Sequence, residues 1–131
     1  MTLYASRASA DAAAERLKTY AQPQRLMILS RLLDGEQTVS ELDAATGIGQ
    51  PALSQQLAEL RRAEIVMARR LSKQVFYRIA NDNVVICVKA IEAMFGGSNA
   101  PADALTAALA DALPPRAPAH AKGAATFVRM G

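Results

Sequence analysis

The hydrophobic pattern of the chain changes its period just after Glu64, and this change constrains the fold more than any other feature of the sequence. Before that point, the segment 51–63 carries leucines at the i, i+4, i+7 spacing of an amphipathic helix, at Leu53, Leu57 and Leu60. Beyond it, residues 65–71 and 75–79 have the composition of two β-strands, and the short polar link between them predicts a hairpin. A chain with this pattern is predicted to be mainly α-helical with one small β-hairpin.

Two helices are predicted near the N-terminus. The first covers 9–20, with Ser9 as its N-cap. The second covers 24–33, because Pro23 suits the first turn of a helix and the following residues form a broad apolar stripe. We expect this second helix to be central to the core.

A short third helix is predicted after Thr38, which forms a capping box with Glu41. The turn 46–49 contains two glycines and leads directly into the helix over 51–63. Two short helices joined by such a turn and followed by a hairpin form the winged helix-turn-helix arrangement. We therefore predict about five core helices plus a wing.

The last core helix, capped by Asn81 or Asp82, precedes two glycines. We accordingly predict one domain over 1–97 and a C-terminal extension over 98–131, which holds 12 Ala and 4 Pro. The extension is predicted to form a short helix over 101–113 and to end in a disordered tail of about 17 residues.

The composition excludes several classes of protein. One His and one Cys are too few for an internal disulfide or a Cys/His zinc site, so we expect no metal and no cofactor. With the single His in the C-terminal extension and no glycine-rich phosphate loop, we expect no enzyme. No apolar run is long enough to span a membrane, and the first ten residues lack the apolar core of a secretory signal. Lone cysteine usage then favours the cytoplasm.

The positive charge is concentrated in one segment. The whole chain has a net charge of +3, whereas 61–80 contains six cations and one anion. The segment 32–60 has five acids and no Lys or Arg. A basic segment of this kind is typical of a surface that binds a polyanion, although a solvated basic face would have the same composition.

The helix over 51–63 has a second face that suits double-stranded DNA. Its first two turns offer small and amide side chains, and 47–58 contains no acid that would repel phosphates. Gln binds adenine through two hydrogen bonds in the major groove, Ser reaches bases or phosphates, and the Ala methyl contacts thymine. The alternative is an ordinary amphipathic surface helix without a DNA-binding role. The basic hairpin that follows directly favours DNA binding over this alternative. The predicted base-reading residues are Gln50, Ala52, Ser54, Gln55 and Gln56.

The hairpin supplies cations close to this helix. Such cations contact flanking phosphates or a narrow minor groove, and they also protect an exposed strand edge from pairing. The predicted contacts are Arg69, Arg70, Lys73 and Gln74.

The segment VSELDAATGIGQPALSQQLAELRRAEIVMARRLSKQVFYRIA resembles the winged-helix core of the ArsR family of bacterial repressors. The preceding AQPQRLMILSRLLDGE resembles the family's second core helix with its Pro-x-Arg-Leu signature, which makes Arg25 a further phosphate contact. The resemblance covers about 8–97. It implies repression of a promoter by a homodimer that binds an imperfect inverted repeat. It also implies an interface made by the first and last core helices, with Leu17, Val84, Val88, Ile91 and Phe95 in it.

The chain departs from the family in informative places. The family usually has His where Gln56 stands and Ser where Gly49 and Pro51 stand, so its operator preference does not transfer in detail. Its metal-sensing members carry Cys-x-Cys at 38–40, or His and Asp on the last helix. This chain has no thiol at 38–40, and its last helix has no His and only Asp82 and Glu92, which are poor ligands at that spacing.

The family's persulfide-sensing chemistry is missing as well. Its members with that chemistry carry cysteines at the positions of Ser30 and Gly96. The chain most resembles the cysteine-poor subgroup that includes the rhizobial nodulation repressor. The residues indicate no signal.

Cys87 has two interpretations, a small buried hydrophobic residue or a thiol that senses redox state or links two subunits. Two other functions compete with a specific repressor. One is a winged-helix module that binds proteins, and the other is an architectural protein that binds DNA without sequence preference. We expect a repressor, because the polar helix face and the basic hairpin are both retained.

Overall fold

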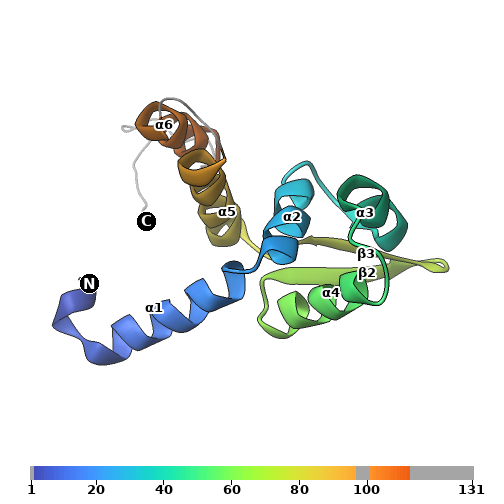
Figure 1. The fold of residues 1–131 in the computed structure, drawn as a ribbon, viewed down its shortest axis with the longest axis horizontal. Helices are drawn as coiled ribbons and strands as arrows, with labels where there is room; N and C mark the ends of the chain where they lie inside the picture. Colours follow the sequence, from blue (N-terminus) through green and yellow to red (C-terminus); the bar gives the residue numbers. More distant parts are fainter. Residues whose placement is uncertain (1, 97–100, 113–131) are drawn as a thin grey trace, which may run out of the picture.

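The computed structural model describes residues 2–96 and 101–112. It contains a winged helix with additional helices at both ends (Figure 1). In chain order the elements are the 3-10 helix η1 (Leu3–Ala5), α1 (Arg7–Tyr20), α2 (Pro23–Leu32), β1 (Gln37–Thr38), α3 (Val39–Thr46), α4 (Ala52–Arg62), β2 (Val66–Leu71), β3 (Gln74–Ile79), α5 (Asp82–Phe95) and α6 (Pro101–Ala112).

The helix boundaries follow from capping residues. Ser6 caps α1, because its side-chain oxygen accepts a hydrogen bond from the Ser9 amide at 3.1 Å. The predicted N-cap Ser9 was wrong, since the helix begins two residues earlier, at Arg7. Pro23 begins α2 as predicted, and its missing N–H costs nothing at that position.

The turn between α3 and α4 is fixed on both sides. Thr38 and Glu41 form the predicted capping box at the start of α3. Gly47 ends the helix with a left-handed backbone, φ 68°, which glycine adopts without strain. Pro51 lies just before α4 as its N-cap and makes no side-chain capping bond.

The sheet has three antiparallel strands in the order β1-β3-β2. Hairpin pairing continues to Leu71 opposite Gln74, so the turn consists of Ser72 and Lys73 alone. Gln74, which we predicted at the tip, is the first residue of β3. The sequence pattern missed β1 altogether, because two residues are too short to show a period.

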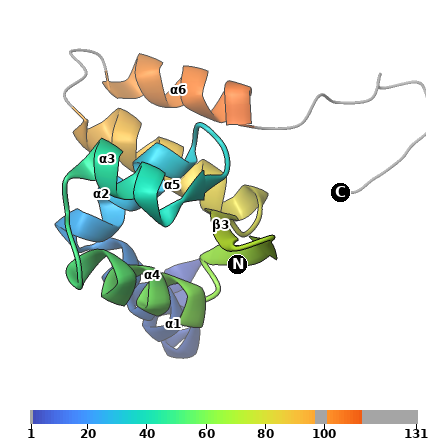
Figure 2. The same cartoon turned by 90° about the vertical axis from the view of Figure 1, so that its right-hand side faces the viewer.

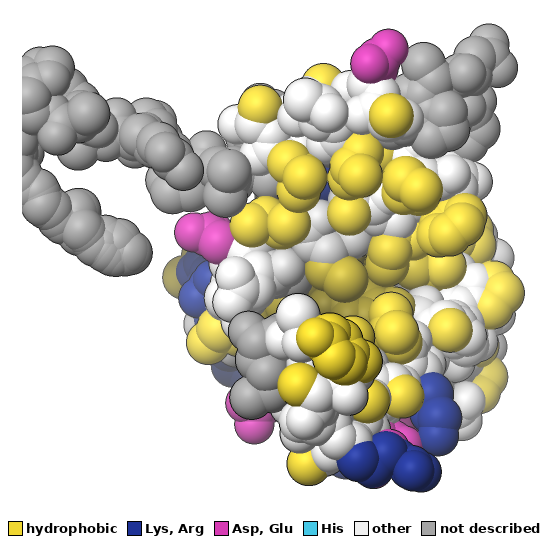
Figure 3. Space-filling view, turned by 90° about the vertical axis from the view of Figure 1, so that its left-hand side faces the viewer, with side chains coloured by type: hydrophobic (Ala, Val, Ile, Leu, Met, Phe, Trp, Pro, Cys, Tyr) yellow, Lys and Arg dark blue, Asp and Glu magenta, His cyan; other side chains and the backbone are white. Residues whose placement is uncertain are grey.

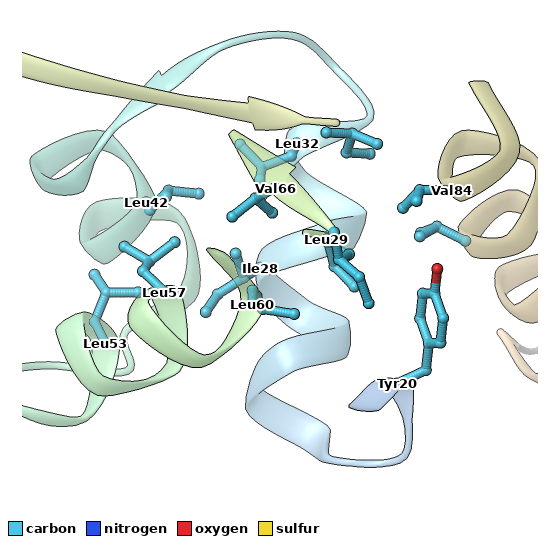
Figure 4. Packing of buried hydrophobic residues seen from close by; sticks show 13 residues of the cluster. Tyr20, Ile28, Leu29, Leu32, Leu42, Leu53, Leu57, Leu60, Val66 and Val84 are labelled. Atoms are coloured by element: carbon cyan, nitrogen blue, oxygen red, sulfur yellow. The ribbon is translucent and has the colours of Figure 1, made fainter. Parts of the chain in front are cut away.

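Aliphatic side chains from every layer form one core (Figure 4). Leu53, Leu57 and Leu60 of α4 are all buried, as their spacing predicted. They pack with α2, α3, the sheet and the turn before β2, where the other core residues are Ile28, Leu29, Leu32, Leu42, Ile65, Val66 and Ile79. Tyr20, Val84 and Val88 extend this core toward α5.

The elements divide into two sides. In Figure 1, α3, α4 and the hairpin lie together on the right, whereas α1, α5 and α6 lie on the left. Figure 2 shows α6 above α5, and these two helices are in contact. α1 leads away from the winged helix, and Tyr20 at its end is its one buried residue.

The C-terminal extension contributes α6 in the described range, and the predicted disordered tail lies outside it. No helix in residues 2–96 and 101–112 is long and apolar enough to cross a membrane.

Candidate nucleic-acid interface

The polar face of α4 is exposed as the sequence predicted. Ser54 and Gln55 are exposed, and Ala52 is half-buried. On the opposite face, the leucines anchor the helix to the core. No side-chain hydrogen bond holds Gln55 within the described residues, so its carboxamide is available to an external partner.

The turn before α4 is held by side chains. The Asp43 carboxylate accepts a hydrogen bond from the Gly49 amide at 2.8 Å. The Gln50 oxygen accepts from the Ser54 amide at 3.2 Å and so caps the helix in place of Pro51. Gln50 therefore stabilises the start of α4, and its amide nitrogen remains free to donate.

Gln56 differs from its neighbour Gln55. It is half-buried, and its oxygen accepts a hydrogen bond from Nε of Arg25 at 2.8 Å. Nη1 of Arg25 also donates to the Thr19 carbonyl at 3.2 Å. Two residues predicted separately to contact bases and phosphates thus lie against each other, at the junction of α1, α2 and α4.

Arg70 and Lys73 provide the positive charge of the wing. Both are exposed, and neither forms an ion pair with a described residue. Lys73 lies in the hairpin turn and Arg70 near the end of β2. Their charges are therefore available to a polyanion.

Arg69 is engaged within the protein. Its Nε and Nη2 donate to the two Glu36 carboxylate oxygens, both at 2.7 Å, and its guanidinium lies 5.1 Å from the Phe76 ring centre. The hydrogen bond from Arg69 lowers the pKa of Glu36, and Glu36 in turn raises the pKa of Arg69. Arg69 therefore braces the hairpin against the loop before β1, and it does not project freely as a phosphate contact.

A second surface to consider lies on the side of α1 and α5, where the sequence predicts a dimer interface. Figure 3 looks onto this side and shows apolar side chains gathered in a broad patch. Leu17 of α1 is 60% exposed and Phe95 of α5 is 81% exposed, and Ile91 is half-buried. Large exposed apolar patches on a protein surface are typical of sites that bind another protein.

Val84 and Val88 do not belong to this exposed surface. They are 1% and 3% exposed in the single chain, where they pack in the core. A partner can contact only atoms that the protomer leaves exposed, so their predicted place in an interface is corrected. Val84, Val88, Ile91 and Phe95 share one side of α5, and the spacing alone did not show that the first half of this side packs in the core whereas Phe95 at its end is exposed.

A buried tyrosine brings a polar hydroxyl into the core between the end of α1 and α5 (Figure 4). Tyr20 is buried, and its hydroxyl points toward α5 (Figure 4). Burial, assisted by the neighbouring Cys87 thiol, raises the pKa of Tyr20 to about 12 against the opposing effect of Arg16. Cys87 is a free, half-buried thiol, and both interpretations of it stay predictions.

A hollow of about 540 Å³ lies between α2, the end of α3 and α5, whose residues line it. Ser30 donates a hydrogen bond to the Glu92 carboxylate at its edge, and Gly96 also lines it. The two positions compared above with sensor cysteines thus border one space. Among the described residues, no group of three or more His, Cys, Asp or Glu side chains could hold a metal ion.

Sequence reasoning missed three residues that organise the interface. They are Glu36, which holds Arg69, Asp43, which holds the turn, and Gln22, whose oxygen accepts from the Arg25 amide at 2.8 Å. Gln22 precedes Pro23 at the start of a helix, so its capping role was detectable. The other two act across loops and leave no pattern in the sequence.

The chain was compared with known proteins. Residues 22–68 match the family model described as the bacterial regulatory protein, arsR family. The biofilm growth-associated repressor of Agrobacterium fabrum is 51% identical over 79 residues, which are 60% of this chain and 68% of that protein. The nodulation protein NolR of Rhizobium meliloti is 36% identical over 87 residues, which are 66% of this chain and 71% of that protein.

Solved structures have the same fold. The transcriptional repressor BigR from Xylella fastidiosa superposes with a TM-score of 0.65 at 42% identity, covering 72% of this chain and 94% of that one. The homodimeric winged helix-turn-helix DNA-binding domain of Mb0332 from Mycobacterium bovis gives a TM-score of 0.59 at 32% identity, covering 66% and 80%. These matches confirm the predicted family resemblance and the predicted winged-helix fold.

Proposed function

Because the chain belongs to the arsR family of bacterial regulatory proteins, we propose that it represses transcription as a homodimer that binds an inverted-repeat operator. The observation that carries the proposal is the combination on one side of the molecule. The exposed polar side chains in the first two turns of α4 lie beside a hairpin on which Arg70 and Lys73 form no ion pair with a described residue. Relatives that are named as repressors support repression of transcription as the effect of binding.

Within this proposal, α4 reads base edges and the wing contacts phosphates. Gln55 and Ser54 are the strongest candidates for base contacts, because both are exposed and both keep side-chain hydrogen-bonding groups free. Arg70 and Lys73 supply charge to any duplex, which strengthens binding without specifying sequence. Arg25 and Gln56, which are joined by a hydrogen bond, are further candidates for contacts to the DNA.

The dimer follows from the apolar patch of α1 and α5. Leu17, Ile91 and Phe95 are the proposed interface residues, since they keep exposed apolar surface in the protomer. A two-fold dimer presents two recognition helices related by symmetry, and such a pair matches an inverted repeat. The homodimeric state of the Mb0332 domain supports this arrangement.

Sedimentation tests the dimer. Phe95→Glu should give monomers at micromolar concentration, because a charge would be buried at the interface. Leu71→Glu is the matched control, since Leu71 is exposed on the hairpin, far along the chain from the patch. A wild-type protein that sediments as a monomer would overturn the dimer and the inverted repeat together.

Titration of random duplex DNA at several salt concentrations tests DNA binding itself. Binding should weaken steeply as salt rises, because contacts to phosphates release counterions. A module that binds only proteins would show no such binding. We place the activity in the bacterial cytoplasm, where genomic DNA is found, and we assign no signal.

A further inference from the structure

The Thr19 carbonyl, near the end of α1, has lost its ordinary helical partner. In an α-helix this carbonyl accepts a hydrogen bond from the N–H four residues later, and that residue is Pro23, which has no N–H. Arg25 of α2 supplies the missing donor, since its Nη1 lies 3.2 Å from the Thr19 oxygen. A cation at this end of a helix also suits the negative pole of the helix dipole. Arg25 therefore caps α1 from the neighbouring helix.

The same guanidinium also contacts α4. Its Nε donates to the Gln56 oxygen at 2.8 Å, and Nε and Nη1 belong to one rigid planar group, so both hydrogen bonds form at once. The start of the Arg25 residue is fixed as well, because its backbone amide donates to the Gln22 oxygen at 2.8 Å. α2 itself packs in the core through Ile28 and Leu29. Arg25 thus forms a half-buried bridge between the end of α1 and α4.

This bridge bears on the direction of α1, which is the less firmly packed of the two helices in the proposed dimer interface. Val84 and Val88 hold α5 in the core, whereas Tyr20, at its last position, is the one buried residue of α1. Figure 1 shows α1 leading away from the winged helix. A helix of 14 residues is about 21 Å long, so a tilt of about 10° at its Tyr20 end moves its start by roughly 4 Å, close to the rise of one base pair.

The direction of α1 matters for the spacing of the DNA half-sites. In a two-fold dimer, the separation of the two α4 helices depends on how the interface helices are placed relative to α4, and the half-site spacing follows from that separation. Leu17, a proposed interface residue, lies within one helical turn of the Thr19 carbonyl. We propose that Arg25 is a positioning residue that fixes α1 relative to α4 and thereby sets the half-site spacing that the dimer accepts. The proposal rests on the homodimeric DNA-binding function above and deepens it.

Affinities for a series of duplexes test this proposal. Each duplex carries the inverted repeat that the wild-type chain selects from a random pool, with the spacer between half-sites kept or changed by one base pair in either direction. The measured quantity is the spacing ratio, which is the affinity for the selected spacer divided by the affinity for the changed spacers. The wild type should give a ratio above one. Arg25→Met and Gln56→Met both break the bridge, and each should lower the ratio about three- to tenfold, as expected when a hydrogen bond to a charged group is lost.

Two control variants separate positioning from direct contact with DNA. Gln56→Glu keeps an oxygen that accepts from Arg25, so it should keep the wild-type spacing ratio even where the added negative charge lowers affinity for every duplex. Gln55→Met is the matched control for Gln56→Met, because Gln55 is exposed and makes no hydrogen bond to a described residue. It should weaken binding to all spacers alike and leave the ratio unchanged. An Arg25 that only contacts a phosphate would likewise leave the ratio unchanged in Arg25→Met.

The outcomes separate the two proposals. If the wild type selects an inverted repeat but binds all spacers equally, the positioning role is overturned and DNA binding stands. The same holds if Arg25→Met or Gln56→Met keeps the wild-type ratio, or if Gln56→Glu loses it as Gln56→Met does. If the wild type selects no inverted repeat, recognition by a homodimer falls and this inference falls with it. Circular dichroism melts show that each variant is folded, and the Gln56 variants test the bridge without removing Arg25.

Discussion

Replacing Gln55 by Ala should separate specific from general DNA binding. The side chain is exposed, and its carboxamide makes no hydrogen bond within the described residues, so its removal leaves the fold intact. A good paired base contact gives about 1–3 kcal/mol of discrimination, which corresponds to roughly 10- to 100-fold in affinity for the operator. Random DNA should lose little affinity, because the phosphate contacts remain.

Leu57→Ala is the control on the opposite face of the same helix. Leu57 is 1% exposed and packs in the core with Leu53 and Leu60, so truncation leaves a cavity. Changes of this type cost about 2–5 kcal/mol of stability. This variant should melt at a lower temperature and lose operator and random DNA binding together.

Fluorescence anisotropy on labelled operator and random duplexes, paired with thermal melts, measures both variants. Our assignment of the two faces of α4 requires that Gln55→Ala melts like the wild type and loses only operator affinity. If Gln55→Ala instead unfolds the protein, or weakens both duplexes equally, the assignment of the helix faces is refuted.

Three further predictions concern charge. Arg70→Ala and Lys73→Ala should each lower the slope of log K against log salt by about one and weaken all duplexes similarly; a change in base preference with an unchanged slope would show that the wing reads bases. Glu36→Gln should release Arg69 from its carboxylate partner, so binding to random DNA should strengthen and the slope should steepen; weaker binding in this titration would show that the brace itself is needed. Tyr20 is neutral in the fold, and its pKa of about 12 exceeds the unfolded value near 10. Its contribution to stability is therefore complete below pH 10 and lost as pH rises toward 12, by about 2 kcal/mol at pH 11.5. Urea unfolding should show this loss in the wild type and not in Tyr20→Phe, and equal losses would contradict it.

The elements of the fold that the sequence predicted are those with local causes. Leucines at helical spacing defined α4, a capping box defined the start of α3, and strand-like composition around a short polar link defined the hairpin. Each of these signals is local in the chain. The strand β1 escaped because it pairs with β3 far along the chain and is only two residues long.

The sequence predicted which face of α4 is exposed, but it did not predict which residues hold the interface side chains in place. The exposed face of α4 followed from where its leucines point, since the remaining positions must face outward. That Arg69 is held by Glu36, 33 positions away, and Gln56 by Arg25, 31 positions away, depends on how the elements pack. For the same reason, the sequence placed Val84 at an interface, whereas the packing of α5 against Tyr20 buries it within the protomer.

Selection of bound duplexes from a random pool, with the full chain at constant salt, tests the central claim most directly. A homodimer that reads bases through α4 should enrich one inverted repeat, and wild-type protein should bind that repeat at least 10³-fold more tightly than random DNA, the lower end of typical specificity ratios. Enrichment of no sequence, or of a single unrepeated site bound by a monomer, would contradict the account.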